Sequence, residues 1–280
     1  MGVFIGIFSF LLGLALGSFM NVCIYRLPLG KSVVSPPSSC PSCGERIRFY
    51  DNIPLLSYLL LRGRCRGCGK RISWRYPLVE GLTGLLSLAL CIRYGFGYQY
   101  LIFLLFSCML LTISFIDLDH QIIPDLLTLP GIVIGFGVAT AGFVMIHHLP
   151  LREILSPAAV PVYRGRYFTW GDVSGFGSLM GILFGYGSLF LVEKGFKLLT
   201  GKEGMGRGDA KLLGMIGAWM GWKSLLPVLM ISSLSGAVIG LVAGRGFGVR
   251  IPFGPFLSMG ALAYLFFGPQ MVSWYVRLYV

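Results

Sequence analysis

Long apolar runs separated by short polar segments make up most of the chain. Several of these runs reach the roughly 20 residues that an α-helix needs to cross the hydrocarbon core of a bilayer. They are too continuous for the in-and-out alternation of an outer-membrane β-barrel. The pattern predicts an all-α polytopic membrane protein of about eight transmembrane helices, near residues 2–24, 77–93, 98–117, 125–147, 173–195, 209–222, 225–243 and 253–275.

The amino-acid composition agrees with a bundle of membrane helices. Hydrophobic residues make up 55% of the chain and charged residues 12%, and the 280 residues include 40 glycines. Glycine destabilises helices in water, but small residues let helices pack closely in a membrane. The run at 2–24 has no basic residue before it and Arg26 after it. This charge order predicts a retained first helix with its N-terminus outside, rather than a cleaved secretion signal.

Lysine and arginine residues are concentrated on one predicted side of the membrane. Together with Lys194, the predicted inside segments hold 17 of the 23 basic residues; these segments are 26–76, 118–124, 196–211 and 244–252. This is the positive-inside distribution. The net charge of +12 then serves membrane orientation and contact with anionic lipid headgroups, so we expect no nucleic-acid partner.

Four cysteines form two Cys-x-x-Cys pairs in the first inside segment. Cys40 and Cys43 are separated from Cys65 and Cys68 by 21 residues, close to the spacing of a four-thiolate zinc ribbon, and a glycine follows each pair. Two disulfides or four free thiols are the alternatives, but a reducing cytosol disfavours disulfides. The pattern predicts a structural Zn²⁺ that cross-links a segment of about 50 residues with few large apolar side chains.

Two aspartates stand at the ends of apolar runs. Asp117 closes the run at 101–116, and Asp209 precedes the run that begins at Ala210. An acid at membrane depth is costly and is therefore a functional candidate by default. Gly206 and Gly208 leave room beside Asp209 for another backbone, such as an extended peptide substrate. The alternative role of Asp209 is to cap the helix that follows it.

Two other acids near Asp117 are weaker candidates for a functional site. Asp119 lies about 200° from Asp117 around a helix, so the two cannot face the same partner. Asp125 precedes an apolar run, where its carboxylate can cap the free amides of a new helix. Asp117 and Asp209 are therefore the candidate pair for chemistry.

A pair of carboxyl groups suits aspartyl protease chemistry. One group takes a proton from water while the other donates a proton to the scissile carbonyl, and sharing one proton separates these two states. The inner ends of two helices would give water access to the pair. No serine or cysteine is recognisably coupled to a histidine base, and no His-Glu-x-x-His motif is present, so other peptidase classes lack support.

Several ordered motifs together resemble the bifunctional bacterial prepilin peptidases, or type IV leader peptidases, which are membrane aspartyl proteases of the Gly-x-Gly-Asp type. Besides the cysteine pairs, the motifs lie at residues 17–22, 26–28, 51–54, 63–66, 72–80, 117–125 and 206–211. The resemblance covers nearly the whole chain. It departs from the family at residues 148–172, a predicted external loop that is long for the family and leaves partner contacts on that side open.

The resemblance implies that Asp117 and Asp209 are the catalytic dyad. It implies a type IV prepilin or pseudopilin substrate, cut after a glycine on the cytosolic side, and N-methylation of the new N-terminal residue with S-adenosylmethionine. The implied organisation is a first transmembrane helix at 1–25, a cytosolic zinc-binding segment linked to methylation at 26–76, and a membrane aspartyl peptidase domain at 77–280. We expect the protein in the bacterial inner membrane, with its active site facing the cytosol.

Residues for the methyl donor follow from the same matches. Gly63 matches a glycine tied to methylation in the family, and Asp51, Asn52 and Glu80 are polar residues in matching motifs. Each has a structural alternative: a turn for Gly63, a loop for the stretch around Asp51, and an ion pair with Arg75 or another basic residue for Glu80. No Gly-x-Gly-x-x-Gly turn is present, so a donor site here is not a Rossmann site.

Two other functions compete with the peptidase. An ion-coupled membrane transporter also uses intramembrane acids and glycine-broken helices, but it requires polar groups along the outer halves of the helices, where the sequence has few. A membrane-tethered zinc ribbon that only recruits partners would leave the aspartates structural. It predicts that Asp117→Asn spares function and that Cys40→Ser abolishes it.

Overall fold

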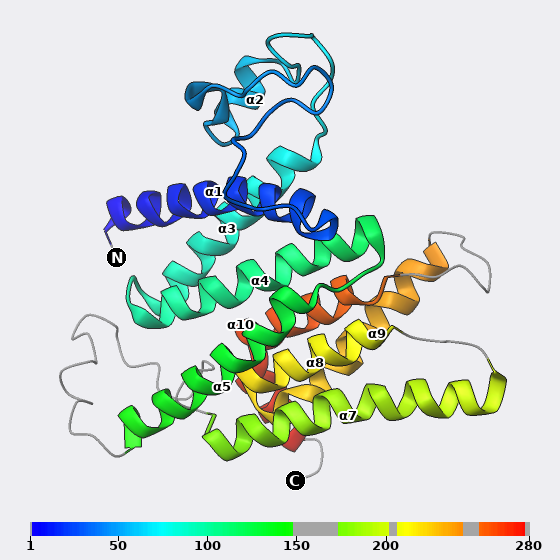
Figure 1. Cartoon of the computed structure of the whole chain (residues 1–280). Helices are drawn as coiled ribbons and strands as arrows, with labels where there is room; N and C mark the ends of the chain where they lie inside the picture. Colours follow the sequence, from blue (N-terminus) through cyan, green and yellow to red (C-terminus); the bar gives the residue numbers. More distant parts are fainter. Residues whose placement is uncertain (1, 148–172, 202–205, 243–251, 278–280) are drawn as a thin grey trace. The chain divides into compact units, whose positions relative to one another are not determined.

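The structure is a computed structural model that describes residues 2–147, 173–201, 206–242 and 252–277 (Figure 1). In these ranges it is helical, with two isolated β-bridges and no β-strand. The long helices are α1 (Val3–Arg26), α3 (Arg75–Tyr94), α4 (Tyr98–His120), α5 (Asp125–His147), α7 (Gly175–Thr200), α8 (Arg207–Met220), α9 (Leu225–Val242) and α10 (Gly254–Arg277). The all-α fold class is confirmed. The predicted external loop at 148–172 and most of the predicted inside segment at 244–252 lie outside the described residues.

Six helices of the described ranges are long and apolar enough to cross a membrane: α1, α3, α4, α5, α7 and α9. The predicted span at 209–222 corresponds to α8, which has only 14 residues and is about 21 Å long, shorter than the roughly 30 Å hydrocarbon core. Nearly all residues of α8 from Asp209 onward are buried. It is therefore a helix enclosed by its neighbours.

The chain divides into two compact units, Met1–Thr112 and Ile113–Val280. In the first unit, α1 and α3 pack antiparallel through small residues. A Cβ atom on Gly13 would lie 2.6 Å from the carbonyl oxygen of Thr83, and one on Gly17 would lie 2.7 Å from the Cα atom of Glu80. Near the other end of the pair, the Ser87 hydroxyl donates a hydrogen bond to the Ser9 carbonyl oxygen at 2.6 Å. Only small residues permit helices to approach this closely.

The segment between α1 and α3 forms a small lobe with little regular structure (Figure 1). It contains the 3₁₀ turns η1 (Leu27–Leu29) and η2 (Phe49–Asn52) and the short helix α2 (Leu56–Leu60). None of these three elements has a buried residue. The lobe therefore lacks a hydrophobic core of its own, as its composition predicts.

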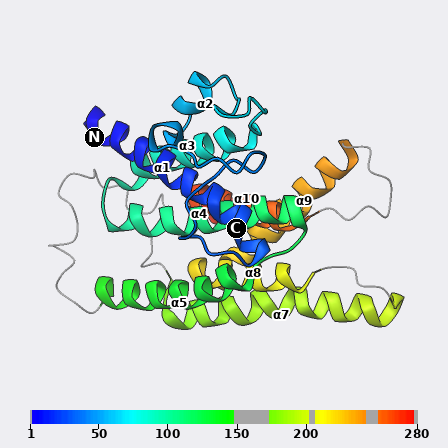
Figure 2. The same ribbon diagram turned by 45° about the horizontal axis from the view of Figure 1, so that its top comes forward.

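In the second unit, α8 packs against α5, α7 and α10. Gly181 of α7 and Gly217 of α8 contact each other directly through their backbones. Trp219 of α8 donates its indole N–H to the Gly131 carbonyl oxygen of α5 at 2.8 Å. Helices α5 and α7 also contact each other and run side by side in Figure 2. This packing sets the position of the first turn of α8, which carries Asp209.

Candidate active site and cysteine centre

Asp117 and Asp209 come together in the second unit. Asp117 lies in the last turns of α4 and is 4% exposed, and Asp209 lies in the first turn of α8 and is 8% exposed. The backbone next to each acid lies against the same side chain: Gly208, which precedes Asp209, contacts Ile123, and so does Gly254, whose amide binds Asp117. Two buried acids at helix ends, 92 residues apart in sequence, therefore share one site.

A third element, the start of α10, holds Asp117. The backbone N–H of Gly254 donates a hydrogen bond to Oδ2 of Asp117 at 2.9 Å. Gly254 is the first residue of α10, where the helix dipole favours negative charge. A Cβ atom on Gly254 would lie 2.7 Å from the same carboxylate oxygen, so the approach requires glycine. Sequence reasoning missed this residue, although a glycine between Phe253 and Pro255 at the start of an apolar run is a signal for a special backbone position.

Ile123, in the connection between α4 and α5, contacts a glycine on each side of this site, Gly208 and Gly254. A Cβ atom on Gly208 would lie 2.8 Å from Cβ of Ile123, and one on Gly254 would lie 3.3 Å from its Cδ1 atom. The space that Gly208 leaves is therefore filled by Ile123. The prediction that both glycines before Asp209 make room for a substrate backbone is wrong for Gly208.

The other acids near Asp117 stand apart from the pair. Asp119 is exposed at the end of α4. Asp125 accepts a hydrogen bond from Lys211 Nζ at 2.6 Å, which links α5 to α8. Asp125 therefore has a structural partner, and the choice of Asp117 over its neighbours agrees with the burial of these side chains.

The four predicted metal-ligating cysteines also come together, in the lobe of the first unit. The sulfurs of Cys40, Cys43, Cys65 and Cys68 all lie within 4.8 Å of one another, and those of Cys40 and Cys68 are 3.9 Å apart. Sulfurs around a tetrahedral Zn²⁺ with bonds of about 2.3 Å are about 3.8 Å apart. The arrangement fits a four-thiolate zinc site and includes no disulfide.

The two cysteine pairs have the same backbone hydrogen bond and the same glycine conformation. In the first pair, the N–H of Gly44 donates to the Cys40 carbonyl oxygen at 2.9 Å; in the second, Gly69 donates to Cys65 at 2.9 Å. Both glycines have φ near +70°, which is why a glycine follows each pair. The backbone N–H groups of Ser42 and Cys43 lower the pKa of the Cys40 thiol to about 6, which favours the thiolate that binds metal.

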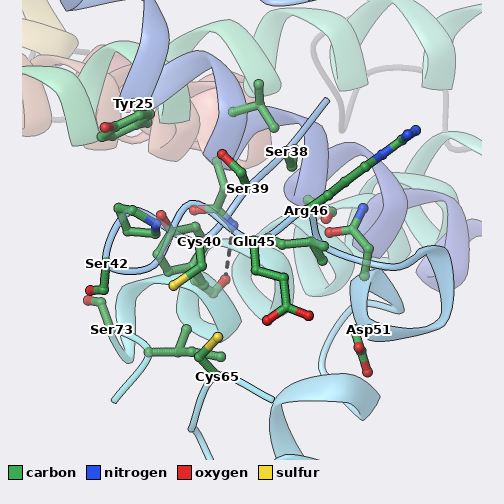
Figure 3. A pocket seen from close by; sticks show the side chains of 18 of the residues that line it. Tyr25, Ser38, Ser39, Cys40, Ser42, Glu45, Arg46, Asp51, Cys65 and Ser73 are labelled. Atoms are coloured by element: carbon green, nitrogen blue, oxygen red, sulfur yellow. Dashed lines mark hydrogen bonds between the residues drawn. The ribbon is translucent and has the colours of Figure 1, made fainter. Parts of the chain in front are cut away.

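A cavity of about 870 Å³ adjoins the cysteines within the first unit (Figure 3). Of the residues predicted for the methyl donor, Asp51, Asn52 and Glu80 line it. Gly63 lies behind Tyr58, which is itself part of the lining. Figure 3 shows Cys40, Cys65, Glu45 and Asp51 around the same space. The structure therefore brings three of the four residues to one cavity.

Asp51, Gly63 and Glu80 each also have a structural role. Arg66 donates three hydrogen bonds to Asp51, at 2.6, 2.9 and 3.2 Å, and this pairing lowers the pKa of Asp51. Gly63 has φ of +64°, as expected for a turn. Glu80 accepts a hydrogen bond from the Leu55 N–H at 2.9 Å, which ties the loop after Asp51 to α3.

Comparisons with known proteins agree with both halves of this description. A model of the bacterial peptidase A24 N-terminal domain matches residues 11–94, and a model of the type IV leader peptidase family matches residues 104–241. Proteins from Xanthomonas campestris and Pseudomonas aeruginosa, both named prepilin leader peptidase/N-methyltransferase, are 39% identical over at least 95% of this chain and 92% of their own length. A protein of that name from Myxococcus xanthus is 41% identical over 86% of this chain and 64% of its own length. No solved structure gives a significant match.

Proposed function

Because the chain belongs to the type IV leader peptidase family, we propose that it is a prepilin leader peptidase and N-methyltransferase. It is a multi-pass protein of the bacterial inner membrane. Residues 77–280 form the peptidase domain, residues 1–25 the first transmembrane helix, and residues 26–76 the cytosolic segment that serves methylation. The substrate is a prepilin or pseudopilin, cut after a glycine.

Asp117 and Asp209 are the catalytic dyad of this proposal. The observation that carries it is the convergence of the two buried carboxyl groups, one of them held by the Gly254 amide. One carboxylate removes a proton from a water molecule that attacks the scissile carbonyl carbon, and the protonated partner donates a proton to the carbonyl oxygen. Two adjacent acids in a poorly hydrated site share one proton, so both forms are present together.

The proposed orientation puts the N-terminus outside and the dyad on the cytosolic side. It rests on the distribution of lysine and arginine residues. The dyad lies at the end of α4 and the start of α8, where a helix end can meet water. If the apolar segment of the substrate lies in the membrane, the peptide bond next to that segment lies at the membrane surface, where these helix ends meet water.

The cysteine centre is proposed to hold a structural Zn²⁺. Four thiolates complete a tetrahedral site and leave no position for a reactive water, so the ion organises the lobe and takes no part in hydrolysis. The lobe has almost no buried side chain of its own, which supports a need for this cross-link.

The adjoining cavity is proposed to bind S-adenosylmethionine, which supplies the methyl group. Its volume of about 870 Å³ is in the range of small-molecule sites. Asp51 and Asn52 would contribute polar contacts to the donor, and Gly63 would position Tyr58 in the lining, whereas Glu80 lines the same cavity from α3. Arginine and lysine side chains in the lobe, such as Arg46, Lys70 and Arg71, suit the carboxylate of the donor.

The test is mass spectrometry of a prepilin that is co-expressed with the protein. We expect a product that is shortened at a glycine and carries one additional methyl group on its new N-terminal residue. An intact leader in the presence of wild-type protein would contradict the proposal. The ion-coupled transporter considered above has no support in the comparisons, since both matched family models describe peptidases.

Gly254→Ala is expected to reduce leader cleavage by about 100-fold without removing a catalytic side chain. The added methyl group would sit 2.7 Å from Asp117 Oδ2, so the carboxylate must move. A displacement of about 1 Å in a catalytic group can reduce the rate by about this factor. Single-turnover cleavage of a prepilin in detergent measures the effect.

The matched control for this variant is Gly236→Ala. A Cβ atom there would lie 3.6 Å from the ring of Phe256, an ordinary contact, so cleavage should stay within about twofold of wild type. Wild-type cleavage by Gly254→Ala would contradict a positioning role for Gly254.

A further inference from the structure

The floor of the cavity in the first unit is built by polar residues of α1 and α3. Asn21 is 3% exposed and Glu80 is 8% exposed, and both line the cavity. The Asn21 side-chain N–H donates to the Tyr76 carbonyl oxygen at 3.1 Å, and Gly17 packs on the backbone of Glu80. Tyr76 and Glu80 are one turn apart on α3. The side chain of Asn21 therefore meets α3 one turn before Glu80.

Asn21 has an unused hydrogen-bond acceptor at this floor. Its Oδ1 atom is buried and has no hydrogen-bond partner among the described residues. A buried acceptor without a partner is unfavourable and rare in native structures, which indicates that a ligand or water completes it. Because the amide N–H of Asn21 is already bonded to Tyr76, the group that completes the site has to be a donor.

Glu80 adds a negative charge to the same floor. Its Oε2 atom accepts the Leu55 N–H at 2.9 Å, and a carboxylate can accept several further hydrogen bonds. Leu55 has φ of 59° and ψ of −47°, a conformation that is strained for a leucine. Strained backbone that is held by a buried side chain is typical of binding sites. A buried carboxylate also favours a cation beside it.

These two acceptors define the chemistry of the missing group. A carbonyl oxygen and a carboxylate that line the same cavity fit a group with several N–H donors and a positive charge. A primary ammonium group meets this description, because it carries a positive charge and three N–H donors.

The depth of the floor indicates which ammonium group binds. Asn21 lies five residues before the end of α1, and Glu80 lies five residues after the start of α3, which is about 7.5 Å inside each helix. Both helices are candidate membrane spans. A ligand at this level is either part of a membrane-embedded chain or has to enter from the lobe.

We propose that Asn21 and Glu80 bind the N-terminal ammonium group of a peptide whose apolar segment follows directly. This inference rests on the proposed function, in which leader cleavage creates such a terminus and the methyltransferase acts on its nitrogen. The floor is then the subsite of the methyl acceptor, and the rest of the cavity is left for the donor.

S-adenosylmethionine carries the same chemistry, since its methionine part has a primary ammonium group. In the donor, however, a carboxylate stands beside the ammonium, and Glu80 would repel it. A peptide N-terminus has a neutral amide in that place. The basic side chains that suit a carboxylate belong to the lobe, including Arg46 and Lys70, so the two ligands separate by charge.

The test is isothermal titration of the full-length protein in detergent with an apolar peptide that has a free N-terminus, in the absence of methyl donor. Acetylation of the peptide should weaken binding at least tenfold, because it removes the charge and two N–H donors. Glu80→Gln and Asn21→Leu should each weaken binding of the free peptide by about tenfold, whereas Asn21→Asp keeps the acceptor and should retain binding.

Matched measurements separate the alternatives. Ser39→Ala changes another residue of the lining and should bind the peptide as wild type does. Zinc content and a single species in size-exclusion chromatography establish that each variant is folded. The affinity for S-adenosylmethionine, titrated without peptide, should change less than twofold in Glu80→Gln and Asn21→Leu.

Two results would overturn the inference. Equal binding of the free and acetylated peptides would exclude an ammonium site, and loss of donor affinity with retained peptide affinity would assign the floor to S-adenosylmethionine. Either result leaves the proposed function standing if the wild-type protein still yields a methylated product. Absence of any methylated product from wild type would instead refute the methyltransferase function itself.

Discussion

Asp117→Asn and Asp209→Asn will each leave the leader attached to a co-expressed prepilin. Asparagine keeps the size of the side chain but can neither accept nor release the proton that hydrolysis requires. Loss of such a general acid or base reduces a rate by about 10²- to 10⁴-fold. We expect no mature product for either variant by mass spectrometry at expression times at which wild type processes all of the prepilin.

The control for this prediction is Asp119→Asn, the same substitution two residues further along α4. Asp119 is exposed, whereas Asp117 is buried, so the Asp119 variant should process prepilin at the wild-type rate. Cleavage of the leader by both Asp117→Asn and Asp209→Asn would refute the aspartyl protease mechanism. Loss of cleavage in all three variants would show that the end of α4 is sensitive to any change, and that the substitutions do not report on chemistry.

Cys40→Ser will remove zinc from the protein and the methyl group from the pilin. The lobe has few buried side chains, and structural zinc binding is worth about 10–16 kcal/mol in small zinc-binding peptides, so the lobe should lose its order without the ion. Since Asp117 and Asp209 lie in the other compact unit, leader cleavage should continue. We expect a shortened pilin with less than a tenth of the wild-type methylation.

Three measurements check this second prediction. Elemental analysis should give about one zinc per chain for wild type and a large loss for Cys40→Ser, and limited proteolysis should cut the variant between residues 27 and 74. Cys23→Ser is the control, because Cys23 lies in α1 outside the cluster. Full methylation by Cys40→Ser, or wild-type protein without metal, would contradict the zinc proposal.

Local sequence patterns were sufficient for the helices and for the cysteine centre. A membrane helix depends mainly on the length of its own apolar run, so the predicted and observed bounds differ by only a few residues. Each cysteine pair folds through hydrogen bonds between residues at most five apart, such as Gly44 to Cys40, and its glycine is visible in the sequence. Spacing alone therefore predicted a cluster that the structure brings within 4.8 Å.

The two aspartates proposed from the sequence are both buried in the structure, but their surroundings were not predictable. Gly254 reaches Asp117 across 137 residues of sequence, and Ile123 fills the space beside Gly208. Such contacts depend on how α8 and α10 pack, and a short polar motif contains no information on that packing.

The sequence by itself determined the all-α membrane class, the positive-inside orientation that we propose, the cysteine centre and the identity of the two candidate acids. Each depends on run length, charge or short spacing, which are properties of neighbouring residues. Only the tertiary structure decided which backbone amide meets Asp117, which acids have structural partners, and that the Asn21 acceptor, in a cavity that Glu80 also lines, has no partner among the described residues. These features arise where helices distant in sequence approach through glycine, and the free energy of that approach comes from packing rather than from local preference.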